Sequence, residues 1–314
     1  MMRSIAIVLL AAIAVFTAAI WIGGRRAETP AATPGEELEG YPLRIVDDMG
    51  RETVLPSMPQ RIVSLAPSNT EILFALGAGD RVVGVTDYCD FPGEVQGIDK
   101  VGGFADPSVE VIVSLQPDLV LATSMHQQQV EQLDSLGVKV MVLFPKDIDD
   151  VLRSIRMVGE AIGGEQQAQA LVETTRGRIE AVTERLETVE ARPLVYYEVF
   201  SDPLMSAGPG TLIHQLIQAG GGINMAGDAD TDYPQYSAEA VIDRNPDVII
   251  FPAYHGTDAL TEEQLLARPG WQEIGALKNR RYHSIDANII SRPGPRIAEA
   301  VEILATMLHP ELFQ

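Results

Sequence analysis

Two glutamates, Glu110 and Glu239, occupy matching positions in a repeated motif, and their carboxylates are the first candidates for chemistry in this chain. The motif reads SVEVIVSLQPDLVL at residues 108–121 and SAEAVIDRNPDVII at residues 237–250, with Ser, Glu, Pro and Asp at identical spacing. Each copy predicts a serine-capped helix with Glu in its first turn, followed by a buried strand. A first-turn carboxylate stabilises the helix dipole, but a matched pair could also bind two basic sockets on a two-fold partner.

No catalytic or metal-binding motif accompanies these glutamates. The chain has no GxxxxGK[ST] and no GxSxG sequence, and GAGDRVVG at residues 77–84 neither fits GxGxxG nor opens a helix. The histidines are scattered without metal-ligand spacing; they are His126, His214, His255, His283 and His309. The sequence therefore favours a binding protein without a catalytic centre, a resident cofactor or a dedicated metal site.

Other polar or reactive residues are expected to be structural. Cys89 is the single cysteine and cannot form an internal disulfide, so we expect it to be buried and unreactive. Acidic clusters at residues 47–48 and 228–232 lie in expected loops. We predict solvated surface at both clusters and no cation site.

Short apolar runs alternate with helical patterns from Tyr41 onward. Strands are predicted at residues 61–65, 81–88, 118–122, 138–144, 194–200, 247–251 and 281–286. Helices are predicted to begin at Thr70 and at Thr211 and to end at Gly77 and Gly220, with others at residues 126–136, 147–162 and 295–308. This alternation indicates an α/β fold with parallel sheets and crossover helices.

The two copies of the motif flank a long helical stretch. Residues 165–189 contain no proline and one glycine, and a helix of this length would extend roughly 37 Å. It could be a surface helix on one domain, but we favour a backbone helix (164–190) that joins two Rossmann-like lobes (43–163 and 191–314). Ligands of open α/β sheets bind beyond the carboxyl ends of the strands, so the lobes would form a ligand cleft between them.

The N-terminus predicts export. Residues 5–22 are apolar and uncharged, with Arg3 before them and Arg25 and Arg26 after. Residues 1–22 are therefore either a signal peptide or an N-terminal membrane anchor, and residues 23–42 form a flexible linker. No cysteine follows the apolar run, as a lipoprotein signal would require. Either alternative places the folded part outside the cytoplasm, in the periplasm or at the outer face of the cytoplasmic membrane.

Charge and length exclude some partners. The 314 residues carry a formal net charge of −21, and without the first 40 residues the charge is still −20. A nucleic-acid partner is disfavoured because phosphate binding needs a basic surface. The length and the 46% hydrophobic content are typical of a folded protein with two domains.

Several motifs resemble the periplasmic cobalamin-binding proteins of ABC importers. They are RIVSLAPSNTEILFALGAGDRVVGVTDYCDFP at 61–92, VGGF at 101–104, the two copies of the repeat, and RPGPRI at 292–297. The resemblance covers about residues 43–310. It extends to the wider class III group with a helical backbone, which binds corrinoids, ferric siderophores, haem and some metals. The resemblance implies two α/β lobes that close slightly on a ligand held between them.

The resemblance also implies roles for individual residues. Glu110 and Glu239 would be docking glutamates that pair with arginines on the two permease subunits. The ligand-binding residues implied by the motifs are Ser68, Tyr88, Phe104, Tyr233 and Arg292. Phe104 and Tyr233 stand where the cobalamin binders often have tryptophan, so they keep flat apolar faces with less stacking area. Such a site suits a corrinoid or another planar macrocycle.

The implied function is that of a non-catalytic, monomeric receptor that captures cobalamin or a related corrinoid and delivers it to an ABC permease. A ferric siderophore or haem is the alternative ligand, since Arg292 would suit an anionic complex. A histidine of the cleft, His126 or His255, could coordinate the metal of such a ligand. An α/β enzyme and a structural module are the alternatives from other classes, and the absence of catalytic motifs and the expected cleft disfavour them.

Overall fold

The computed structural model describes residues 40–253 and 261–313. The predicted signal or anchor at residues 1–22, and the linker up to residue 39, lie outside the described residues. Within the described part of the chain, no helix is long and apolar enough to cross a membrane.

The first lobe, here the N-lobe, is built on a parallel four-stranded sheet in the order β4-β3-β5-β6. Its strands are β3 (Ile62–Ser64), β4 (Val82–Val85), β5 (Leu119–Ala122) and β6 (Val140–Val142). All residues of β3, β5 and β6 are buried, as expected for parallel strands covered on both faces. A short antiparallel hairpin of β1 (Leu43–Val46) and β2 (Glu52–Leu55) precedes the sheet; its short strands were not predicted.

Helices cover both faces of this sheet. They are α2 (Pro67–Ala75), α3 (Val109–Ser114), α4 (Gln127–Ser135) and α5 (Ile148–Ile162). The prediction that the first helix begins at Thr70 is wrong by one turn, because Pro67 already occupies the first helical position, where its fixed φ and missing N–H are tolerated. Ser68 therefore lies in the first turn of α2.

The second lobe, the C-lobe, has a five-stranded sheet in the order β11-β10-β7-β8, with β9 also paired to β7. Its strands are β7 (Leu194–Ser201), β8 (Leu204–Ser206), β9 (Ile223–Asn224), β10 (Val248–Ala253) and β11 (Tyr282–Asp286). All pairs are parallel except β7 with β8. The helices are α7 (Leu212–Ala219), α8 (Ala238–Arg244), α9 (Glu262–Leu266), α10 (Gly275–Lys278), α11 (Ala287–Ile290) and α12 (Ile297–Leu308).

The internal repeat is preserved in the backbone. Gln116 and Asn245, the residues before Pro-Asp in each copy, both adopt the left-handed conformation, with φ of 49° and 47°. Asp118 accepts from the backbone N–H of Arg61, just before β3, and Asp247 accepts from that of Leu194 at the start of β7. Each copy thus fixes its helix end to the first sheet strand of its own lobe.

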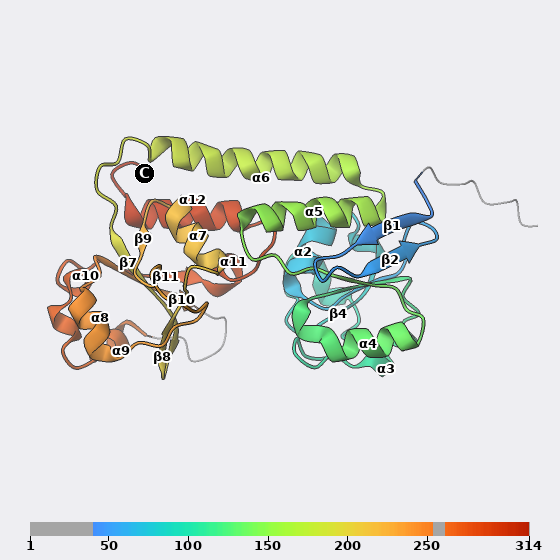
Figure 1. Cartoon of the computed structure of the whole chain (residues 1–314), viewed down its shortest axis with the longest axis horizontal. Coiled ribbons are helices and arrows are strands. Elements are labelled where there is room, and N and C mark those ends of the chain that lie inside the picture. Colours follow the sequence, from blue (N-terminus) through green and yellow to red (C-terminus); the bar gives the residue numbers. More distant parts are fainter. Residues whose placement is uncertain (1–39, 254–260, 314) are drawn as a thin grey trace, which may run out of the picture. The chain divides into compact units, whose positions relative to one another are not determined.

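The long helix is α6 (Glu165–Arg185), somewhat shorter than the predicted stretch. It packs along α5 of the N-lobe and α12 of the C-lobe, on the side of these helices away from the sheets (Figure 1). Arg178 of α6 donates two hydrogen bonds to the Glu302 carboxylate on α12, at 2.8 and 2.6 Å. One buried apolar cluster includes residues of α5, α6, α7 and α12, so both lobes share a helical layer. The α/β fold with two lobes and parallel sheets is confirmed, whereas the lobe boundaries at 43–163 and 191–314 stay predictions.

One predicted solvated surface is wrong. Asp47 is buried, and its carboxylate accepts hydrogen bonds from the backbone N–H groups of Met49, Arg51 and Val142. These bonds compensate for its burial and fix the β1–β2 turn to the end of β6. The second acidic cluster is exposed, and Asp228 there pairs with Arg244. Cys89 is buried, as predicted.

Candidate ligand cleft

A cleft of about 670 Å³ is lined by residues of both lobes. The N-lobe contributes segments that follow the carboxyl ends of β3, β4, β5 and β6, and the C-lobe contributes the segment after β11. This is the position at which open parallel sheets bind ligands. The lining residues lie at 66–68, 88, 103–106, 123–125, 143–145, 287–288 and 291–293.

Apolar and aromatic side chains dominate the N-lobe wall of the cleft. Tyr88 and Met125 are 63% and 61% exposed, and Phe144 is 40% exposed; large apolar side chains so open to solvent are typical of a surface that receives a partner or ligand. Phe104 also lines this wall. Met125 and Phe144 were missed by the sequence reasoning. Met125 follows the strand predicted at 118–122 and Phe144 ends the one predicted at 138–144, so the rule that ligands lie at the carboxyl ends of strands would have identified both.

Phe104 lies at the tip of a tight loop. An antiparallel bridge between Gly102 and Pro107 closes the loop at its base, and Gly102 has a φ of 108°, a conformation that favours glycine. Residues 103–106 form the tip, and all four line the cleft. The loop therefore presents its side chains to the cleft from a fixed base.

His126 attaches this loop to the end of β5. Its Nδ1 accepts from the backbone N–H of Thr123 at 3.1 Å, so its Nε2–H donates to the Phe104 carbonyl at 2.7 Å. The Phe104 and His126 rings also meet edge to face, 5.5 Å between centroids. His126 is fully buried, and burial lowers its pKa below the ordinary value despite the opposing hydrogen bond to Phe104.

The suggestion that a histidine of the cleft coordinates a ligand metal can be compared with the structure for His126. The hypothesis is wrong for His126, because both of its ring nitrogens already have partners and the ring has no exposed surface. His255 lies outside the described residues. Among the residues that the structure describes, no group of three His, Cys, Asp or Glu side chains could hold a metal ion.

Arg292, the expected cleft arginine, lines the cleft but is already paired with carboxylates of the N-lobe. Its Nη1 lies 3.0 Å from Glu71 Oε1 and 2.6 Å from Asp90 Oδ1, and its Nη2 donates to the Tyr88 carbonyl. Burial alone would raise the pKa of Asp90, but the hydrogen bond and charge of Arg292 outweigh it and lower that pKa. The guanidinium thus links the two lobes beside the cleft.

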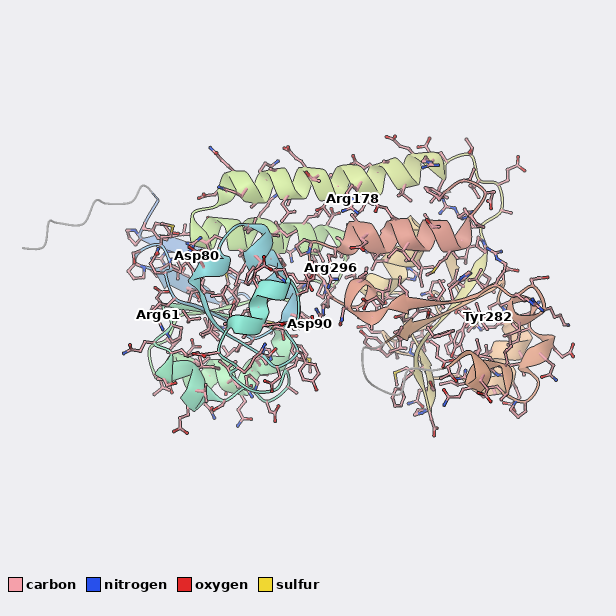
Figure 2. All side chains as sticks on the ribbon, turned by 180° about the vertical axis from the view of Figure 1, so that it is seen from behind. Arg61, Asp80, Asp90, Arg178, Tyr282 and Arg296 are labelled. Carbon is pink, nitrogen blue, oxygen red and sulfur yellow. The ribbon has the colours of Figure 1, made fainter. Side chains whose placement is uncertain are left out.

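A second arginine completes this interlobe network. Arg296, at the start of α12, binds both oxygens of Glu71, with distances of 2.9 Å from Nε and 2.7 Å from Nη2. Its guanidinium also lies 4.4 Å from the ring centroid of Phe91. Figure 2 shows Arg296 and Asp90 where the two lobes meet. The Glu71 side chain is only 3% exposed, so it is a buried carboxylate between two cations.

The structure brings together four of the five expected ligand-binding residues. Ser68, Tyr88, Phe104 and Arg292 all line the cleft. Tyr233 is not among its lining residues. It is 54% exposed and lies in a segment hydrogen-bonded to β8 and to the turn at Gly208. A role for Tyr233 in ligand binding stays a prediction.

Glu110 and Glu239 lie in the first turns of α3 and α8, which Ser108 and Ser237 cap as predicted. Both glutamates are exposed, and no described lysine or arginine pairs with either. The pKa of Glu239 is lowered by hydrogen bonds to its own backbone N–H and to Ser237. Each lobe therefore presents one exposed carboxylate on an equivalent helix.

Another hollow, of about 700 Å³, belongs to the C-lobe alone. It is lined by Arg192, His214 and Arg244 among others, and Arg192 precedes β7, so the hollow lies toward the amino end of that strand. Arg244 there binds both oxygens of Asp228. Ligands of this architecture bind at the opposite end of the strands, so the cleft between the lobes is the candidate ligand site.

A model of a known protein family matches most of the chain. The family is described as periplasmic binding protein, and the match covers residues 62–289. The chain belongs to this family of periplasmic binding proteins. The family comprises non-enzymatic substrate-binding components of ABC transporters, so the protein binds a small molecule and does not convert it.

Individual relatives support the same assignment. The chain is 34% identical over 299 residues to the uncharacterized ABC transporter substrate-binding lipoprotein YvrC of Bacillus subtilis, covering 93% of each chain. It is 31% identical over 277 residues to a cobalamin-binding protein of Halobacterium salinarum, covering 86% of this chain and 74% of that one. The structure of the periplasmic haem-binding protein RhuT from Roseiflexus sp. RS-1 superposes with a TM-score of 0.73 at 29% identity, covering 81% and 99%. The names of the last two proteins give different ligands, cobalamin and haem.

Proposed function

We propose that this protein captures cobalamin or a related corrinoid outside the cytoplasmic membrane and delivers it to an ABC permease. The observation that carries the proposal is the cleft itself. Its N-lobe wall presents Tyr88, Phe104, Met125 and Phe144 to a space of about 670 Å³, and the three aromatic rings among them can pack against the face of a macrocycle. The similarity to cobalamin-binding relatives supports the same ligand.

The pairing of Arg292 favours a corrinoid over the alternative ligands. A ferric catecholate or a haem with ionised carboxylates needs cationic partners, and Arg292 would have supplied one. Its guanidinium is instead committed to Glu71 and Asp90. A corrinoid has neutral carboxamide side chains and needs no such counter-charge. Ferric siderophore or haem binding is therefore the second candidate, and the similarity to the haem-binding protein RhuT supports haem.

Delivery would use the two exposed glutamates. Glu110 and Glu239 have equivalent positions on α3 and α8, one per lobe, and no described cation neutralises them. We infer that they pair with arginines on the two permease subunits, with the protein acting as a monomer in the periplasm or at the outer face of the membrane. Ligand binding would bring the lobes together by a modest shift in population, which favours docking.

Co-elution of a coloured ligand tests the proposal. The purified protein is mixed in turn with hydroxocobalamin, haemin and a ferric catecholate and passed over a size-exclusion column. We expect the corrinoid colour to elute with the protein. Retention of haemin or the catecholate without the corrinoid would favour the second candidate.

A further inference from the structure

We propose that Asp106 makes the cleft selective for the charge of its ligand, admitting neutral or cationic macrocycles and disfavouring anionic ones. The inference rests on the proposed function, because it concerns the ligand of the same cleft. It names a selectivity residue that neither the motifs nor the resemblance had indicated.

Asp106 is the charged lining residue of the cleft that lacks an opposite charge beside it. Among the described lining residues only Asp106 and Arg292 are charged, and Arg292 is neutralised by the N-lobe carboxylates. Asp106 has no ion-pair partner among the described residues. Lys146 lies near the margin, with its Nζ 5.1 Å from the Phe144 ring centroid, but it is not a lining residue. The wall therefore presents a negative charge to the ligand.

The loop geometry fixes this carboxylate beside the aromatic wall. Asp106 lies two residues after Phe104 in the tip that the Gly102–Pro107 bridge closes and His126 tethers. A Cβ added at Gly103 would come within 2.3 Å of Asp106 Oδ1, so the carboxylate folds back over Gly103. A ligand packed on Phe104 would have its edge close to this charge.

The chemistry of the candidate ligands makes the charge decisive. Corrinoids carry carboxamide groups around the ring, whose N–H groups can donate to a carboxylate. Haem carries carboxylates and a ferric catecholate is strongly anionic. The Asp106 carboxylate repels both, and the repulsion is stronger when the bound ligand excludes water from around it. We expect repulsion between the Asp106 carboxylate and one anionic group at the edge of the ligand, in a partly hydrated cleft, to lower the affinity about five-fold.

The experiment compares the ratio of haemin to cyanocobalamin affinity in the full-length protein and in the Asp106→Asn and Asp106→Lys variants. Asp80→Asn is the matched control, because Asp80 is exposed in the 3₁₀ turn before β4 (Figure 2), at the end of the sheet opposite the cleft. We expect the ratio to rise about five-fold in Asp106→Asn, to rise further in Asp106→Lys, and to stay constant in Asp80→Asn.

The outcomes separate this inference from the proposed function. Haemin binding that becomes measurable only in the Asp106 variants would also support charge selection. An unchanged ratio in both Asp106 variants, or no measurable haemin binding to any of the proteins, would overturn it, even if cyanocobalamin binds tightly. Failure of cyanocobalamin to bind the unmodified protein would instead contradict the proposed function.

Discussion

Arg296 of the C-lobe binds both carboxylate oxygens of Glu71 in the N-lobe, across 225 residues of sequence. The same carboxylate also accepts from Arg292, which lines the cleft. Glu71 lies on α2, which begins with cleft residues, while Arg292 lies within the cleft segment at 291–293 and Arg296 follows it closely. This ion network therefore links the position of one cleft wall to that of the other. The network therefore ties the two lobes together beside the cleft.

Replacing Glu71 by Gln should destabilise the fold strongly. The substitution leaves two largely buried guanidinium groups without their shared anion, and breaking a buried pair typically costs about 3–5 kcal/mol. Urea unfolding followed by circular dichroism measures the loss. Glu302→Gln is the matched control, since the Arg178–Glu302 pair is solvent-exposed and should contribute less than about 1 kcal/mol. Equal losses in both variants would contradict a special role for the buried network.

Stability should depend on pH through His126. Its pKa is lowered in the folded state, so the unfolded chain binds a proton first as the pH falls. The stability that the neutral ring contributes is complete above the ordinary histidine pKa, about 6.5, and is lost as the pH falls toward the folded-state value. We expect the free energy of unfolding to decline across this window in the unmodified protein and to decline less in His126→Gln. An unchanged decline in that variant would assign the effect to other groups.

The same histidine should position the ligand wall. His126→Phe removes the hydrogen bonds to Phe104 and Thr123 and should weaken corrinoid binding, whereas His126→Gln retains an acceptor and a donor and should restore much of it. Thermal melts first confirm that both variants are folded. Equilibrium titrations with the corrinoid then compare their affinities. Equal affinity in the two variants would show that the tether does not matter for the ligand.

Tyr88 should contribute directly to ligand affinity. Its ring is largely exposed at the cleft, so Tyr88→Ala removes stacking area with little effect on the fold. An aromatic contact of this kind contributes about 1–1.5 kcal/mol, which corresponds to roughly ten-fold in affinity. Leu136→Ala removes an equally exposed apolar side chain at the end of α4, away from the cleft, and should leave the affinity unchanged.

Reversal of both docking carboxylates should separate capture from delivery. Glu110→Lys combined with Glu239→Lys places repulsive charges where the permease arginines are expected, so cellular uptake of the ligand should be abolished. Neither residue lines the cleft, and ligand affinity should stay within about two-fold of the original, since exposed distant charges are screened. Loss of ligand binding in the double variant would argue against a docking role.

Much of the fold could be predicted because its signals are local. The repeat predicted the matching helix caps at Ser108 and Ser237, which the structure confirms, and the apolar runs predicted the central strands. The short strands β8 and β9 escaped prediction, because neither lies in an apolar run of the kind that marked the equally short β3 and β6. The site was less predictable for a different reason. The partners of Arg292 lie more than 200 residues away in sequence, and only the packing of the two lobes shows that its charge is already neutralised.

The most direct test of the central claim is an equilibrium titration of the purified protein with cyanocobalamin, followed by intrinsic fluorescence, with haemin and a ferric catecholate as competitors. The account predicts saturable cyanocobalamin binding at micromolar or tighter affinity, weakened by Tyr88→Ala and resistant to both competitors. Tight binding of haemin or the catecholate, with no measurable binding of any corrinoid, would contradict it.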